Sequence, residues 1–139
     1  MKVMKLLYYI GTTLSMLVGV WHFFIPSMFQ WYSYIPNEYD TLIVGIVWTN
    51  FFFSLLLSGM SFLLIILCKK VFGGSKDALI FYGFFVFVWF CRVAITFIVP
   101  WPLEPIAWVA YGQQIATFII LIMLILPFVS LLRSKTIRT

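Results

Sequence analysis

Five polar residues interrupt the long apolar stretches of this chain and are the residues best suited to chemistry: His22, Asn50, Arg92, Gln113 and Gln114. An arginine within a membrane span costs at least about 2.5–3.5 kcal/mol on insertion scales, so such a residue usually has a function. We expect a ligand pocket in which Arg92 holds an anionic or carbonyl-bearing group. His22 would donate or accept a proton there, and the amides of Asn50, Gln113 and Gln114 would orient the ligand.

Both ionisable residues also have a purely structural interpretation. His22 could be hydrogen-bonded within a helix bundle, and Arg92 could pair with Glu38, Asp40 or Glu104 and fix the helices to one another. Because it could lie close to Arg92, Glu104 is also a candidate residue of the ligand-binding site. The sequence leaves these alternatives open.

Haem and metal ions are disfavoured as cofactors. His22 is the only histidine, which rules out a haem held by two histidines of one chain. A metal site would need carboxylate or thiolate ligands at the same depth, and only Cys91 is near. The sequence therefore predicts no metal ligands.

Composition sets the framework that must position these residues. The chain has 139 residues, of which 64% are hydrophobic and 9% charged, with a mean hydropathy of +1.11. A soluble domain needs more polar surface than this. Spans of about 20 residues account for most of the length, so we predict a single-domain, all-α integral membrane four-helix bundle. The expected spans are residues 6–24, 41–67, 78–99 and 106–128.

The distribution of charge predicts the orientation of this bundle. All lysines and arginines except Arg92 fall on one side if four spans alternate, and the acidic Glu38, Asp40 and Glu104 fall on the other. By the positive-inside rule both termini are cytoplasmic, in a multi-pass protein of the cell membrane. Because the cations follow span ends rather than one polar face, we expect the lipid bilayer, and not nucleic acid, as the partner.

The candidate residues share one depth within the expected spans. With a rise of about 1.5 Å per residue, Arg92 and Gln113 lie about 10 Å, and Asn50 about 13 Å, below the outer ends of their helices. His22 lies one turn from the outer end of the first span. The inner halves hold almost nothing comparable, which predicts a pocket in the extracytoplasmic half and argues against a continuous pore.

Small and polar residues recur at intervals of three or four, so each expected helix has a face suited to close packing. We expect these faces to point into the bundle: Gly11, Ser15 and Gly19; Asn50, Ser54 and Ser58; Trp89, Arg92 and Thr96; Ala110, Gln113 and Thr117.

One segment resembles a known family. Residues 19–26 (GVWHFFIP) followed by Phe29 resemble the G-x-x-H-F-x-x-P-x-x-F signature that ends the first span of DoxX-like membrane proteins. Residues 108–114 (WVAYGQQ) are similar to the glutamine-bearing fourth span of that family. The resemblance implies a four-helix bundle in a bacterial cytoplasmic membrane, with His22, Pro26 and Gln113 or Gln114 at motif positions.

The resemblance also implies a ligand class and partners. The best-known members of the family are membrane subunits associated with quinone-linked sulfur oxidation or redox-stress complexes, which makes quinone the candidate cofactor. This chain departs from the family in its second span, where relatives often carry a glutamate and Asn50 is the nearest polar residue. That departure weakens the case for proton-coupled redox chemistry.

Three hypotheses of function follow, and the sequence does not decide whether the protein is an enzyme. The leading one is a binding or accessory protein whose pocket holds a quinone-like or lipid/anionic ligand, beside a partner membrane subunit or in a homo-oligomer. The second is a quinone-linked oxidoreductase subunit that uses His22 for proton transfer. The third is a small oligomeric transporter.

Overall fold

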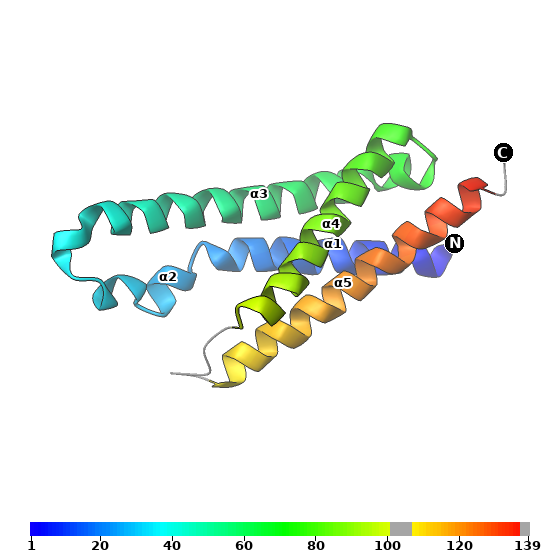
Figure 1. Ribbon diagram of the computed structural model, residues 1–139. Helices are drawn as coiled ribbons and strands as arrows, with labels where there is room; N and C mark the ends of the chain where they lie inside the picture. Colours follow the sequence, from blue (N-terminus) through cyan, green and yellow to red (C-terminus); the bar gives the residue numbers. More distant parts are fainter. Residues whose placement is uncertain (101–106, 137–139) are drawn as a thin grey trace.

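The described part of the chain is entirely helical. The computed structural model describes residues 1–100 and 107–136, without the side chains of residues 37, 107, 135 and 136. Its long helices are α1 (Lys2–His22), α3 (Asp40–Phe72), α4 (Lys76–Ile98) and α5 (Ala107–Thr136), and the link between α1 and α3 forms α2 (Ile25–Met28) and the 3-10 turns η1 (Trp31–Tyr34) and η2 (Asn37–Tyr39) (Figure 1). All four long helices are long and apolar enough to cross a membrane. The prediction of an all-α bundle of four apolar helices is confirmed.

The helices are longer than the expected spans. α1 begins at Lys2 rather than at residue 6, and α5 continues through Pro127 to Thr136 rather than ending at residue 128. Hydropathy marks only the apolar part of each helix, whereas backbone hydrogen bonds continue into its basic flank. Pro127 lies inside α5 and, because it lacks an N–H, cannot donate the helical hydrogen bond to the residue four positions earlier. One turn before Pro127, the Leu124 carbonyl of α5 accepts a hydrogen bond from the Tyr82 hydroxyl of α4 at 2.5 Å.

The four long helices form a ring in which α1 contacts α3 and α5, and α4 contacts α5 and α3. Figure 1 shows α1 and α3 running together while α4 and α5 cross them obliquely. The first part of α3 continues beyond α4 and α5. The two helix pairs therefore separate towards the end of the molecule that carries the α1–α3 link.

The two ends of the bundle differ in charge. The start of α1, the end of α5 and the α3–α4 turn lie at the end opposite the α1–α3 link (Figure 1). This end, which we call the basic end, carries Lys2, Lys5, Lys69, Lys70, Lys76 and Arg133. Glu38 and Asp40 lie at the other end, which we call the pocket end.

A packed core fills the bundle from the basic end to its middle. Tyr8, Leu64, Tyr82, Phe85 and Leu124 are each completely buried. Tyr8 also donates from its hydroxyl to the Leu64 carbonyl at 2.6 Å, so α1 and α3 are joined by a polar contact inside this core.

A buried hydrogen-bonded chain connects three helices at the outer edge of the core. Trp89 Nε1 donates to Ser15 Oγ at 3.0 Å. The Ser61 Oγ lies 2.9 Å from Ser15 Oγ and 2.6 Å from the Leu57 carbonyl oxygen. Because the carbonyl can only accept and each hydroxyl has one hydrogen, Ser61 donates to Leu57 and Ser15 donates to Ser61. The expected inward face of α1, which includes Ser15, is buried as predicted.

The closest approach of α1 to α3 depends on a glycine. A methyl group at Gly19 would lie 2.6 Å from the backbone nitrogen of Ser58, whereas one at Gly45 would meet nothing within 4 Å. We predict that Gly19→Ala lowers the free energy of unfolding by about 1–3 kcal/mol, the cost of overpacking. Gly45→Ala is the matched control and should be neutral or stabilise by up to about 1 kcal/mol. Thermal unfolding in detergent measures both, and equal effects of the two substitutions would contradict the packing described.

Candidate functional site

A cavity of about 660 Å³ lies where the two helix pairs separate at the pocket end. It is enclosed by the end of α1, α2, η1, the last two turns of α4 and the start of α5. His22, Arg92, Gln113 and Gln114 line it, so four of the residues predicted for the site come together. The remaining lining residues are Ile25, Trp31, Ile95, Thr96, Val99, Pro100, Ala110, Tyr111 and Thr117.

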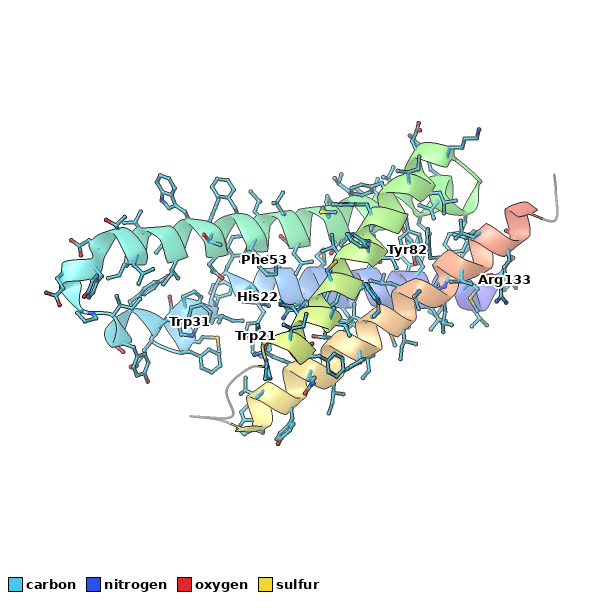
Figure 2. All side chains as sticks on the ribbon, in the orientation of Figure 1. Trp21, His22, Trp31, Phe53, Tyr82 and Arg133 are labelled. Carbon is cyan, nitrogen blue, oxygen red and sulfur yellow. The ribbon has the colours of Figure 1, made fainter. Side chains whose placement is uncertain are left out.

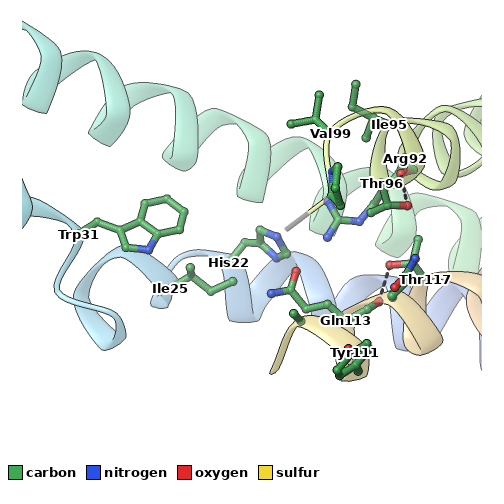
Figure 3. A pocket seen from close by; sticks show the side chains of 13 residues that line it. His22, Ile25, Trp31, Arg92, Ile95, Thr96, Val99, Tyr111, Gln113 and Thr117 are labelled. Carbon is green, nitrogen blue, oxygen red and sulfur yellow. Dashed lines mark hydrogen bonds between the residues drawn. The ribbon is translucent and has the colours of Figure 1, made fainter. Parts of the chain in front are cut away.

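His22 is the last residue of α1 and points towards Arg92 (Figure 3). Its Nδ1 lies 2.8 Å from the Val18 carbonyl oxygen. Because that oxygen can only accept, Nδ1 carries the hydrogen, and in the neutral ring Nε2 then presents a lone pair. The Phe53 ring packs against the imidazole with centroids 5.0 Å apart. The ring is thereby held in one orientation, with Nε2 as its remaining polar atom.

Asn50 does not line the cavity but fixes the backbone of His22. Its Nδ2 donates to the His22 carbonyl oxygen at 2.8 Å. In a continuous helix this carbonyl would accept from the residue four positions later, which here is Pro26 and has no N–H. Asn50 of α3 supplies the missing donor across the α1–α3 contact. The predicted polar layer therefore receives cavity-lining side chains from three long helices, and α3 contributes a positioning residue.

Arg92 enters the cavity from α4 without a partner in the described part of the chain. Its Nε atom is buried and has no hydrogen-bond partner. Neither Glu38 nor Asp40, both exposed, forms an ion pair with it within residues 1–100 and 107–134. Glu104, the other predicted partner, lies outside the described residues. A buried guanidinium is costly unless an anion or acceptors meet it.

The other polar groups of the cavity come from α4 and α5. Thr117 donates from its hydroxyl to the Gln113 carbonyl at 2.7 Å (Figure 3). Thr96 donates from its hydroxyl to the Val93 carbonyl at 2.6 Å. With their hydrogens used, both hydroxyls offer only lone pairs to the cavity. Gln113 lies below the His22 ring in Figure 3. Its side-chain amide has two N–H donors and one carbonyl oxygen that accepts.

The cavity ends at the packed core. Beyond Arg92 and Thr117, towards the basic end, the next buried side chains of α4 and α5 include Trp89, Ile120 and Tyr82. Figure 2 shows Tyr82 nearer to the basic end than His22. The three side chains are almost completely buried and pack against one another on this side of the cavity. Within the described residues, the cavity is thus closed towards the basic end.

Sequence reasoning missed part of the lining. Ile95 and Val99 lie three and seven positions after Arg92, so the helical period that placed Thr96 could also have indicated them. Ile25 and Trp31 belong to the irregular link, where no period predicts the path of the chain. Trp31 is not among the residues that the sequence predicts for the site, yet it lines the cavity.

Metal binding has no support in the described residues. Within them, no three His, Cys, Asp or Glu side chains come together as a metal ion requires. Cys91, considered as a neighbour of His22, is exposed and does not line the cavity.

Comparison with known proteins identifies no relative of this chain. No family model, no curated protein and no solved structure matches the chain. The resemblance to DoxX-like proteins stays a prediction from the segment around His22, and the function must be argued from the site itself.

The contact between Asn50 and the His22 carbonyl can be tested by substitution. Asn50→Leu leaves this buried carbonyl unpaired, which we expect to lower the free energy of unfolding by about 1–3 kcal/mol. The neighbouring Thr49 is exposed, so Thr49→Leu is the matched control and should change it by less than about 0.5 kcal/mol. Chemical unfolding of the two variants in detergent gives the comparison. An Asn50→Leu variant as stable as the control would show that the contact does not hold α1.

Proposed function

We propose that this chain is a multi-pass protein of the cell membrane that binds an amphipathic ligand with an anionic or carbonyl-bearing end, quinone-like or lipid, in the cavity at the pocket end. The observation that carries the proposal is Arg92, whose Nε is buried beside the cavity and has no hydrogen-bond partner among the described residues. A ligand oxygen in the cavity would meet the guanidinium of Arg92, for which the described residues supply no acceptor. Hydrogen bonds to a charged group are about twice as strong as neutral ones.

The surroundings of Arg92 support a binding role. His22 Nε2 and the Gln113 amide reach the same cavity from α1 and α5. A cavity of about 660 Å³ falls within the range of about 300–1,000 Å³ typical of small-molecule sites. As an accessory protein, the chain would present this ligand to a partner membrane subunit or to a second copy of itself.

A second candidate function is a quinone-linked oxidoreductase subunit. The lone pair of His22 Nε2 towards the cavity is the feature that favours it, because a general base must reach the proton that it removes. A transporter is less well supported, since the packed core that includes Trp89 closes the bundle below the cavity. His22→Ala separates binder from enzyme: a binder loses part of its affinity, whereas an enzyme keeps its ligand and loses turnover.

The binding proposal predicts a molecule that co-purifies through Arg92. Native mass spectrometry of gently extracted protein should show an added mass on the parent chain and its loss on Arg92→Leu, because the ligand loses its charged donor. Arg133→Leu is the matched control: Arg133 is exposed at the basic end, so its variant should keep the added mass. An absorption spectrum of the same sample identifies a quinone. Equal occupancy in Arg92→Leu and Arg133→Leu would contradict the proposal.

The orientation in the membrane gives a separate prediction. We expect the basic end to face the cytoplasm, as cations of short loops do. In a chain with Cys68 and Cys91 replaced by alanine, Glu38→Cys should react with an impermeant maleimide in intact cells. Lys76→Cys should react only after permeabilisation. The reverse pattern would place the cavity in the cytoplasmic half of the membrane.

A further inference from the structure

The cavity changes from polar to apolar along its length. On α4 its lining runs from Arg92 through Thr96 to Val99, and on α5 from Thr117 to Ala110. Each run covers about 10 Å along its helix. Both proceed from the packed core towards the pocket end, so Arg92 and Thr117 lie at the same, inner end of the cavity. On α5 the side chains of Gln114, Gln113 and Tyr111 follow Thr117 before Ala110 is reached.

The link between α1 and α3 completes the apolar end. Ile25 of α2 is buried, and the Trp31 indole comes from η1. Figure 3 shows both side chains on the far side of His22 from Arg92 and Thr117. The cavity thus has a polar floor against the core and an apolar, aromatic mouth.

This gradient is opposite to that of a phospholipid. Lipid headgroups lie at the membrane surface and their chains point towards the bilayer centre. A phospholipid of the leaflet around the pocket end would set its chains against Arg92 and its headgroup against Val99 and Trp31. A ligand that matches the cavity has its polar group at the inner end and its apolar part towards the mouth.

The charge of the lining limits the polar group. Among the described lining residues Arg92 is the only cation and there is no carboxylate. One guanidinium matches one carboxylate through two parallel N–H···O bonds. A phosphate, with more charge and more oxygens, would leave acceptors unpaired here.

Resting on the binding function proposed above, we infer that the ligand is a compact monocarboxylate with an apolar body, bound carboxylate-first. Its carboxylate meets Arg92 at the floor of the cavity, and its apolar body lies between Trp31 and Val99 at the mouth. Gln113 flanks the carboxylate as a second donor.

Brominated octanoates test both the class and the direction of the ligand, because bromine quenches tryptophan emission at short range. The protein is studied in phosphatidylcholine nanodiscs, and the Trp31 signal is the difference between the parent chain and Trp31→Phe. 8-Bromooctanoate, labelled at its apolar end, should quench this signal saturably, and plain octanoate should reverse the quenching. 2-Bromooctanoate, labelled beside the carboxylate, should compete for the site but leave most of the Trp31 signal.

The same titration in two arginine variants assigns the carboxylate contact. Arg92→Leu should raise the concentration for half-saturation about tenfold or more, the loss of a charge-assisted hydrogen-bonded pair. Arg133→Leu should change it by less than about twofold, because an exposed charge contributes little.

The possible failures are distinguishable. Equal quenching of Trp31 by both bromooctanoates would overturn the carboxylate-first direction. Displacement of 8-bromooctanoate by equimolar short-chain phosphatidylglycerol or by a short-chain benzoquinone would overturn the carboxylate class, with Arg92-dependent binding left intact. If half-saturation is the same in Arg92→Leu as in Arg133→Leu, the inference and the proposed function both fail.

Discussion

A polar group inside an apolar bundle needs a partner within the protein, because hydrocarbon offers none. The hydroxyls of Tyr8 and Tyr82 meet this requirement by donating to carbonyls of neighbouring helices, as the Asn50 amide does at the end of α1. Each such bond both satisfies a donor and joins two helices. Arg92 Nε is the buried side-chain atom of the described chain that finds no partner. That exception lies beside the cavity at the pocket end.

The position of this cavity follows from the packing. Gly19 allows α1 and α3 to approach closely, while α4 and α5 cross that pair and separate from it at the pocket end. Pro26 ends the hydrogen bonding of α1 just after His22, and Asn50 donates to the His22 carbonyl that is left without its helical partner. The same local sequence thus ends the helix, turns the chain into α2 and orients the imidazole. Asn50 of α3 thereby supports the end of α1 from which His22 enters the cavity.

Much of this arrangement is predictable from the sequence, for identifiable reasons. Hydropathy marks the four helices because each must cover an apolar length, and counting residues from helix ends places His22, Arg92 and Gln113 at one level. The same counting misplaces Asn50, since depth does not tell whether a side chain faces a cavity or a neighbouring backbone. Trp31 was missed because the path of the irregular link depends on tertiary contacts. Whether α4 and α5 separate from α1 depends on side-chain packing between helices, which the helical periodicity of the sequence does not predict.

The central claim is that α1, α4 and α5 bring their polar side chains to one cavity, and intramolecular cross-linking tests it most directly. In a chain without Cys68 and Cys91, a short thiol cross-linker should join His22→Cys to Gln113→Cys and His22→Cys to Arg92→Cys within one monomer. Trp21 precedes His22 and is exposed on another face of α1, so Trp21→Cys paired with Gln113→Cys should stay unlinked. Cross-linking of the Trp21 pair in place of the two His22 pairs would contradict the site.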